Sequence, residues 1–292
     1  MENNKVAVVG AGLMGNGIAQ ACATAVYEVV NIDTFEAAIE KAQTTVEKLF
    51  SRKVAKGSMT EEKKAEILER LTYSSDLTDV KDSFLVVEAV PENIDIKKDT
   101  FKKIDELADP ETVIVSNTSG LSISEIASVT NRPDKVMGAH FFYPAPVMKL
   151  LELVRGLATS DKTYETVREF AGKIGKTTVD APEFPGFMVN RILVPMQNEA
   201  AFMVMEGSSP EDVDNAMKLG CNHPMGPIEL TDFVGIDTML ATMTGLYKGF
   251  HDSKYRPCPL LETMVKSGML GKKSGQGFYK YDEKGNKIGS NF

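Results

Sequence analysis

The sequence has few of the features that mark secreted, metal-binding or membrane-spanning proteins. Its 292 residues include three cysteines, Cys22, Cys221 and Cys258, which form no C-x-x-C pair. An odd number of scattered cysteines predicts reduced thiols in a cytoplasmic protein and leaves a metal site without ligands, so we expect no metal. No apolar stretch approaches the roughly 20 residues that a helix needs to cross a bilayer, so we expect no membrane span.

An excess of positive charge is also absent. The net charge of −8 argues against nucleic acid as the main partner, although it leaves room for a local basic patch. Residues 1–4 are polar and lead directly into an apolar run, so we expect no signal peptide there. A hydrophobic fraction of 42% and a charged fraction of 25% are typical of a globular protein, here of one large or two ordinary domains.

What the sequence does contain is a glycine-rich start. The apolar run 6–9 is too short for a helix and predicts a buried strand, and the loop Gly10-Ala11-Gly12-Leu13-Met14-Gly15 follows it. Small apolar residues at helical spacing come next, and a second strand over 28–32 ends at Asp33. Strand, G-x-G-x-x-G, helix, strand and acid stand in the order that a dinucleotide-binding site requires.

The loop residues have predicted parts in cofactor binding. Gly10 allows the tight turn, Gly12 lets the backbone approach a pyrophosphate, and Gly15 lets the helix pack closely on the strand. Leu13 and Met14 open the helix, whose free N–H groups and positive dipole end favour phosphate. The alternative is an ordinary glycine-rich turn between a strand and a helix.

The acid at the end of the second strand indicates which dinucleotide is bound. Asp33 can accept both hydroxyls of an adenosine ribose, whereas a 2′-phosphate there would meet like charge. The next residues, Thr34 and Phe35, supply no arginine to receive such a phosphate. The sequence therefore favours NAD over NADP.

Further apolar runs predict a mostly parallel sheet. Strands are expected at 84–90, 112–115, 136–142 and 150–154, in a Rossmann-like α/β domain. Two consecutive helices, one over 35–56 and one beginning near Thr60, interrupt the strand pattern and suggest an inserted helical hairpin. Its tip carries a basic cluster that includes Lys53 and Lys56. This cluster is either a solvated face or a place for a polyphosphate tail.

Polar residues at strand ends are placed for chemistry. The stretch 116–119 closes one strand, where ligands collect in parallel sheets, although Ser and Thr are also common helix caps. His140 closes the next strand, and Glu152 is the one carboxylate in the apolar strand that follows. A buried carboxylate needs a partner, and a His oriented by it becomes a general base suited to an alcohol. The alternative is that Glu152 lies on an exposed strand face.

The pattern becomes helical after the Pro- and Gly-rich stretch 182–186. Helices are expected at 187–205, from Ser209 onward, at 232–247 and at 259–267. We therefore predict a Rossmann-like NAD-binding domain over residues 1–185. An all-α domain over residues 186–292 is predicted to serve substrate binding and dimerisation, and its long apolar first helix favours a homodimer.

Several stretches together resemble one known family. They are Gly10-Ala11-Gly12-Leu13-Met14-Gly15, 116–119, His140-Phe141-Phe142, 146–150, 185–191 and 275–279. In residue types and spacing the whole chain resembles the 3-hydroxyacyl-CoA dehydrogenase family, most closely its bacterial 3-hydroxybutyryl-CoA dehydrogenase branch.

The resemblance implies roles for individual residues. His140 and Glu152 would form the catalytic pair, and Ser119 and Asn190 would polarise the substrate oxygen. Further NAD contacts are implied at Asp33, Glu92, Lys97, Ser119 and Lys273. The basic hairpin would receive the phosphates of an acyl-CoA through residues such as Lys53 and Lys56. The implied reaction, in fatty-acid or butyrate metabolism, is the NAD-dependent oxidation of a (3S)-3-hydroxyacyl-CoA or the reverse reduction of acetoacetyl-CoA.

One residue next to the catalytic pair departs from the family pattern. The family has His-Phe-Phe-Asn-Pro, whereas position 143 here is Tyr. A phenol at Tyr143 can narrow the acyl pocket, shift cofactor affinity or replace one hydrogen bond by another, so fine substrate choice stays open. Two other readings remain: a related dehydrogenase acting on 3-hydroxyadipyl-CoA or a sugar acid, and a non-catalytic NAD(H)-binding protein.

Overall fold

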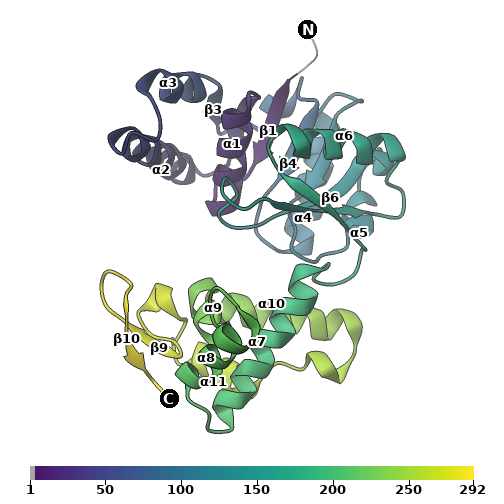
Figure 1. Cartoon of the computed structure of the whole chain (residues 1–292). Helices are drawn as coiled ribbons and strands as arrows, with labels where there is room; N and C mark the ends of the chain where they lie inside the picture. Colours follow the sequence, from purple (N-terminus) through teal and green to yellow (C-terminus); the bar gives the residue numbers. More distant parts are fainter. Residues whose placement is uncertain (1–3) are drawn as a thin grey trace. The chain divides into compact units, whose positions relative to one another are not determined.

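The computed structural model describes residues 4–292; residues 1–3, in the polar start of the chain, lie outside the described residues. The chain divides between Glu183 and Phe184 into two compact units (Figure 1). The first unit is built on a large sheet and the second mainly on helices.

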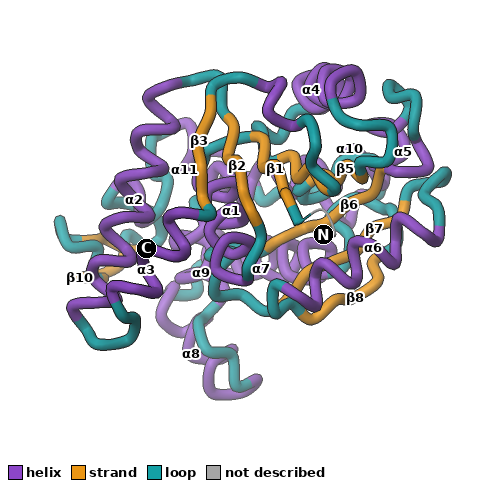
Figure 2. The backbone as a smooth tube through the Cα atoms, turned by 90° about the horizontal axis from the view of Figure 1, so that it is seen from above, coloured by secondary structure: helices purple, strands orange, loops and turns teal. Residues whose placement is uncertain are grey.

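An eight-stranded sheet forms the centre of the first unit. In chain order its strands are β1 (Lys5–Val9), β2 (Glu28–Ile32), β3 (Leu71–Ser74), β4 (Leu85–Glu88), β5 (Val113–Ser116), β6 (Val136–Phe141), β7 (Leu150–Arg155) and β8 (Thr177–Ala181). They lie side by side in the order β3-β2-β1-β4-β5-β6-β7-β8 (Figure 2). Every neighbouring pair is parallel except β6 and β7, which are antiparallel. The predicted Rossmann-like, mostly parallel sheet is confirmed.

The sequence does not predict the two edge strands. β3 has the sequence Leu-Thr-Tyr-Ser and β8 the sequence Thr-Thr-Val-Asp-Ala, and both are only partly buried. An edge strand has a neighbour on one side alone, so it needs fewer apolar residues than a central strand. Neither stretch therefore contains the apolar run that identifies the central strands.

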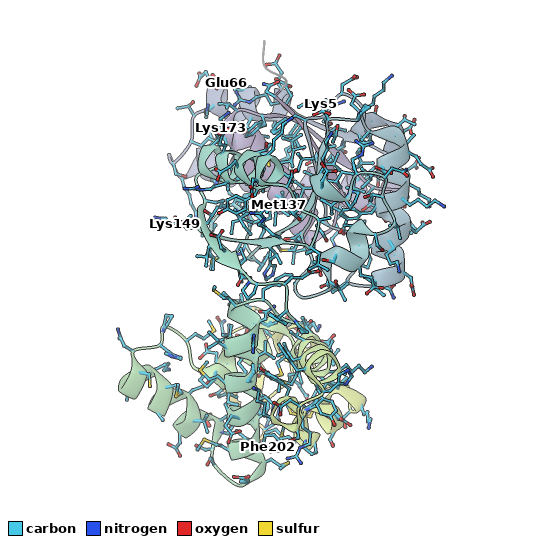
Figure 3. The ribbon with its side chains drawn as sticks, turned by 90° about the vertical axis from the view of Figure 1, so that its right-hand side faces the viewer. Lys5, Glu66, Met137, Lys149, Lys173 and Phe202 are labelled. Atoms are coloured by element: carbon cyan, nitrogen blue, oxygen red, sulfur yellow. The ribbon has the colours of Figure 1, made fainter. Side chains whose placement is uncertain are left out.

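Helices connect the strands and pack on the sheet. They are α1 (Leu13–Ala25), α4 (Ile94–Leu107), α5 (Ile123–Ala127) and α6 (Asp161–Lys173), with short 3₁₀ turns at Leu77–Val80 and Pro133–Lys135. The helical hairpin between β2 and β3 consists of α2 (Glu36–Ala55) and α3 (Glu61–Glu69). Thr60 caps α3, because its hydroxyl accepts a hydrogen bond from the Lys63 backbone N–H. Figure 3 shows Met137 of β6 among the packed side chains of this unit and Lys149 at its surface.

The second unit contains helices and one small hairpin. The helices are α7 (Val189–Met205), α8 (Pro210–Cys221), α9 (Pro227–Val234), α10 (Ile236–Phe250) and α11 (Pro259–Lys266), with short 3₁₀ turns at Ser253–Tyr255 and Lys272–Ser274. The prediction of an all-α domain is wrong in one respect, since β9 (Tyr279–Tyr281) and β10 (Lys287–Ser290) form an antiparallel hairpin. Strands of three and four residues are too short to carry a recognisable period. The single helix expected at 232–247 is interrupted at Gly235, whose φ is +105°.

Two buried carboxylates attach the hairpin to the helices of the second unit. Asp232 accepts hydrogen bonds from the backbone N–H groups of Phe278 and Tyr279, each at 2.9 Å. Asp214 accepts one from the Tyr279 hydroxyl at 2.7 Å. A Cβ at Gly277 would lie 2.1 Å from Asp232 Oδ1, so only glycine allows this approach. The Gly-Phe-Tyr stretch near the C-terminus is therefore explained by packing against a carboxylate.

The stability of the second unit is expected to depend on the charge of Asp232. Burial raises the pKa of Asp232 from 3.8 to about 6 despite its hydrogen-bond donors. The folded state thus favours the neutral acid, and this contribution to stability is present below about pH 4 and is lost as the pH rises through 6. Relative to Asp232→Asn, which stays neutral, the wild-type free energy of unfolding should fall by about 2 kcal/mol between about pH 4 and pH 7. Urea denaturation of both proteins at both pH values measures this. The wild-type free energy of unfolding minus that of Asp232→Asn should fall with pH, and a value that stays constant or grows would disprove the prediction.

Among the described residues, no helix combines the length and the apolar character that crossing a membrane requires.

Candidate active site

The glycine loop after β1 has the geometry of a phosphate-binding turn. Gly10 has φ +107°, and a Cβ at Gly15 would lie 1.9 Å from the Gly10 carbonyl oxygen, so neither position accepts a side chain. A Cβ at Gly12 would meet nothing within 4 Å, and the backbone there borders open space. α1 begins at Leu13 with no side-chain cap on its first N–H groups. Met14, the second residue of α1, packs partly against the core. The loop therefore fits the pyrophosphate of a dinucleotide.

Two polar side chains of β2 and its end hold this loop in place. Asp33 Oδ2 accepts a hydrogen bond from the Ala11 backbone N–H at 2.7 Å. Asn31, which is fully buried, donates from Nδ2 to the carbonyl oxygens of Val8 at 3.0 Å and Gly10 at 2.9 Å. A carboxylate has about four lone-pair sites, so Asp33 can bind the loop and still accept ribose hydroxyls.

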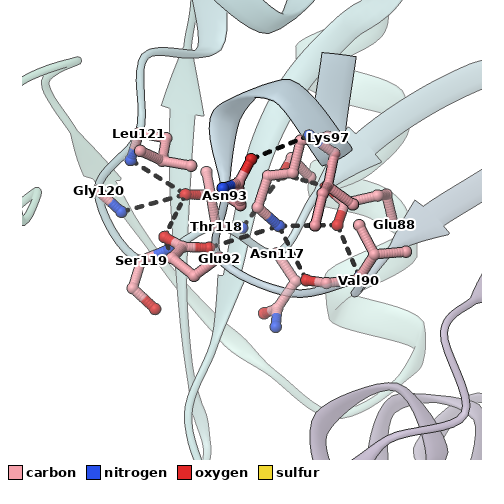
Figure 4. Close-up of polar contacts among 12 residues, drawn as sticks. Glu88, Val90, Glu92, Asn93, Lys97, Asn117, Thr118, Ser119, Gly120 and Leu121 are labelled. Carbon is pink, nitrogen blue, oxygen red and sulfur yellow. Dashed lines mark hydrogen bonds and ion pairs between the residues drawn. The ribbon is translucent and has the colours of Figure 1, made fainter. Parts of the chain in front are cut away.

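The end of β4 carries a carboxylate that is completely buried. Glu88 accepts hydrogen bonds from Lys97 Nζ at 2.7 Å, from the Val90 backbone N–H at 2.7 Å and from the Ser116 hydroxyl at 2.6 Å. The exposed fraction of the Lys97 side chain is 1%. Its ammonium lies between Glu88 and Glu92, whose Oε2 is 3.4 Å away (Figure 4). Lys97 is thus held by two carboxylates of its own chain.

Glu92 in turn holds the turn that carries Ser119. Its Oε1 accepts hydrogen bonds from the Thr118 hydroxyl at 2.6 Å and from the Ser119 backbone N–H at 2.8 Å (Figure 4). The Glu92 side chain is 45% exposed, so it also borders solvent. Asn117 Oδ1 accepts from the Phe141 backbone N–H at 2.8 Å, which joins this turn to the end of β6. Glu92, Ser119 and the end of β6 are therefore fixed relative to one another.

The pairing of β6 with β7 brings His140 and Glu152 together. They are direct partners in the antiparallel register, and His140 Nδ1 lies 2.7 Å from Glu152 Oε2. The Glu152 side chain is fully buried, which excludes the exposed strand face considered above. A carboxylate at Nδ1 fixes the tautomer that has its lone pair on Nε2. The Phe142 ring packs against the imidazole at a centroid distance of 4.5 Å. The arrangement is suited to moving a proton at Nε2.

A pocket of about 740 Å³ lies beside the glycine loop. It is lined by Ala11 and Gly12, by α1, by α2 and by the loop 143–147 that follows β6. The α2 side contributes four cations, Lys41, Lys48, Arg52 and Lys53. Lys56, which follows α2, is exposed and does not line the pocket. The structure thus places one of the two predicted lysines at the pocket and the other outside it.

The remaining predicted residues belong to the second unit. Asn190 lies in the first turn of α7. Lys273 Nζ forms an ion pair with Asp237 Oδ1 at 2.5 Å, and the Lys273 side chain is 46% exposed.

Comparison with known families identifies the enzyme family to which this site belongs. The sequence model of the NAD binding domain of 3-hydroxyacyl-CoA dehydrogenase matches residues 5–184, and that of the C-terminal domain matches residues 186–281. The chain belongs to the 3-hydroxyacyl-CoA dehydrogenase family. It is an NAD-dependent dehydrogenase, and the prediction of NAD as the cofactor is confirmed.

Individual 3-hydroxyacyl-CoA dehydrogenases match the chain over almost all of their length. The chain is 49% identical to a probable 3-hydroxybutyryl-CoA dehydrogenase of Bacillus subtilis, over 97% of this chain and 99% of that protein. It is 47% identical to the 3-hydroxybutyryl-CoA dehydrogenase of Clostridioides difficile, over 96% of this chain and 100% of that protein. The crystal structure of (S)-3-hydroxybutyryl-CoA dehydrogenase from Ralstonia eutropha has a TM-score of 0.92 at 47% identity, covering 97% of this chain and 100% of that chain.

Some residues that shape this dehydrogenase site are not predicted from the sequence. Glu88 ends an apolar strand, and Glu152 interrupts one. Burying a carboxylate costs free energy unless it has a partner, so both positions carried the same signal of a buried partner. Asn31 gave the same kind of signal, as an amide inside an apolar strand. Lys41 gave none, because its place at the pocket follows from how α2 packs beside α1.

Proposed function

We propose that the chain catalyses the NAD-dependent oxidation of (3S)-3-hydroxybutyryl-CoA to acetoacetyl-CoA and the reverse reduction. The observation that carries this proposal is the buried His140–Glu152 pair, with 2.7 Å between Nδ1 and Oε2, at the same edge of the sheet as the glycine loop. The names of the relatives support the four-carbon substrate. The pocket of about 740 Å³, with the four cations that α2 contributes to it, supports a phosphate-bearing carrier.

His140 moves the proton in the proposed reaction. Nε2 accepts the proton of the substrate hydroxyl, and Glu152 at Nδ1 stabilises the imidazolium that forms. NAD, when bound, supplies the acceptor for the hydride from C3. In the reverse direction the imidazolium returns the proton to the substrate oxygen.

Two further side chains are proposed to polarise the substrate oxygen. Ser119 is held by the hydrogen bond from its backbone N–H to Glu92, which fixes the position of its turn. Its hydroxyl is proposed to donate to the oxygen as carbonyl character develops. The family resemblance assigns Asn190 the same role. Asp33, Glu92, Lys97 and Lys273 are proposed to serve the cofactor, Lys97 by holding Glu92 in place.

The cations of α2 are proposed to receive the phosphates of CoA. Replacing Lys53 by Glu should raise KM for acetoacetyl-CoA by about tenfold, because a charge-assisted contact to phosphate is lost and a repulsion is added. The effect should shrink at high salt, which screens exposed charges. Steady-state kinetics at two ionic strengths measures it.

Lys102→Glu is the matched control, since Lys102 is an exposed lysine of α4 that does not line the pocket. If the two replacements raise KM equally, Lys53 does not contact the phosphates of CoA.

The second unit is proposed to mediate a homodimer in the cytoplasm. Large apolar side chains of this unit are exposed, among them Ile192 at 74% and Met203 at 46% on α7 and Leu219 at 86% on α8. Exposed apolar area of this kind favours a protein–protein contact. Light scattering on the purified protein tests the dimer, and a Ile192→Asp variant that stays dimeric would argue against α7 as the interface.

The proposed reaction is tested in the oxidative direction. NAD reduction is measured with (3S)-3-hydroxybutyryl-CoA, with its 3R enantiomer and with 3-hydroxyadipyl-CoA. We expect turnover of the 3S substrate and little with the other two. Preferred turnover of 3-hydroxyadipyl-CoA would show that the pocket serves an acidic acyl chain instead.

A further inference from the structure

Tyr143 lines the pocket beside the glycine loop with a hydroxyl that forms no hydrogen bond within the described residues. It follows His140 by three residues, in the loop between β6 and β7, and its side chain lines the pocket. The residue is 50% exposed. Among residues 4–292 no side chain or backbone group accepts a hydrogen bond from its hydroxyl or donates one to it. A tyrosine with an apolar ring and an uncommitted hydroxyl is suited to a ligand that is itself part apolar and part polar.

The loop that carries Tyr143 is firmly held. Lys176 Nζ donates to the carbonyl oxygens of Met148, at 2.7 Å, and of Ala145. The backbone N–H groups of Val147 and Met148 both donate to the Pro144 carbonyl oxygen, at 2.9 and 3.0 Å. α1 also lies against this loop, since a Cβ at Gly17 would be in van der Waals contact with Ala145 Cβ at 3.4 Å. Tyr143 is therefore presented from a preorganised backbone, which lowers the entropic cost of any contact that it makes.

The position of this loop determines which part of a CoA thioester it meets. The cations of α2 and the loop 143–147 line the same pocket, and His140 lies near the end of β6, three residues before Tyr143. If the phosphates lie on α2 and the thioester lies at His140, we expect the segment between them to run along this loop, which lines the pocket and follows His140 closely in the chain. In CoA that segment is the pantetheine arm, whose two amides and gem-dimethyl group present both hydrogen-bonding and apolar surface.

We propose that Tyr143 is a specificity-determining residue that recognises the pantetheine arm of the substrate, with its hydroxyl hydrogen-bonded to an arm amide and its ring packed on the arm. The proposal rests on the function proposed above, because it takes a CoA thioester as the substrate. According to the proposal, Tyr143 contacts the CoA carrier of the acyl group and contacts neither the acyl group itself nor NADH.

The test compares three substrates that differ only in the carrier: acetoacetyl-CoA, acetoacetyl-pantetheine and the ethyl thioester of acetoacetate. For Tyr143→Phe, kcat/KM should fall about fivefold with the first two, the worth of one neutral hydrogen bond, and less than about twofold with the ethyl thioester. For Tyr143→Ala the loss with the first two should be larger, because the ring contact is also removed. KM for NADH should stay near the wild-type value in both variants.

Tyr247→Phe is the matched control, since Tyr247 is an exposed tyrosine of α10 outside the pocket. An equal loss with all three substrates, or a raised KM for NADH, would place Tyr143 at the acyl group or the cofactor and overturn the inference. A loss with acetoacetyl-CoA alone would place it at the nucleotide and overturn it as well.

The same data separate this inference from the proposed function. If the wild type has the same kcat/KM for the ethyl thioester as for acetoacetyl-CoA, the CoA site itself is refuted. If the wild type prefers acetoacetyl-CoA but Tyr143→Phe leaves that preference unchanged, only the role of Tyr143 is refuted.

Discussion

Replacing His140 by Gln is expected to lower kcat for acetoacetyl-CoA reduction by about 10²–10⁴-fold while NADH binding stays almost unchanged. Glutamine is similar in size and its amide can still donate to Glu152, which lies 2.7 Å from the imidazole Nδ1. It cannot, however, give a proton to the substrate oxygen or take one from it. Steady-state kinetics measures the loss, and fluorescence titration with NADH measures cofactor binding.

His223→Gln provides the control for this replacement. His223 lies in the second unit, just after α8, and forms no ion pair or side-chain hydrogen bond within the described part of the chain. It should keep wild-type turnover. Near-normal turnover of the His140→Gln variant would refute His140 as the proton-transfer group, whatever happened to the control.

Replacing Lys97 by Met is expected to lower the free energy of unfolding of the first unit by about 3–5 kcal/mol. The Lys97 side chain is 1% exposed and Glu88 0%, with 2.7 Å between Nζ and Oε1. Losing the ammonium leaves a buried carboxylate that only the Ser116 hydroxyl and the Val90 N–H still compensate. Glu92 also loses the ammonium with which it forms an ion pair, so NADH affinity should fall together with stability. Urea denaturation measures the stability change.

The same helix offers a matched control. Lys103 pairs with Asp99 on α4 at the same distance of 2.7 Å, but the two side chains are 57% and 63% exposed. Lys103→Met should therefore cost only about 0–1 kcal/mol. A Lys97→Met variant as stable as Lys103→Met would show that the buried pair does not stabilise the fold. The double variant Lys97→Met with Glu88→Gln should recover part of the loss, because it removes the uncompensated charge.

The central part of the sheet follows from the sequence because its strands are buried on both faces. Runs such as Val6–Val9 consist of apolar residues throughout, and each ends in the loop or side chain that matters for the site. The edge strands β3 and β8 are partly exposed and lack such runs. Each edge strand forms because it pairs with a strand that is distant in the sequence. The local pattern of residues therefore does not predict it.

The proton-transfer pair follows from the sequence for a similar physical reason. Glu152 in an apolar strand requires a partner, and a short turn places His140 opposite it in the antiparallel register. The same requirement, applied to Glu88 at the end of β4, leads to Lys97 and Ser116. The cations of the pocket are different. Lys41 and Lys53 both lie on α2 within a charged surface, and only the packing of α2 shows which of its many charges face the pocket.

The most direct test of the proposed function is NADH oxidation with acetoacetyl-CoA, measured in parallel with NADPH. We expect rapid consumption of NADH, formation of (3S)-3-hydroxybutyryl-CoA and much slower use of NADPH, because Asp33 disfavours a 2′-phosphate. Tight NADH binding without reduction of acetoacetyl-CoA would contradict the proposal and show that the His140–Glu152 pair serves another hydroxy acid.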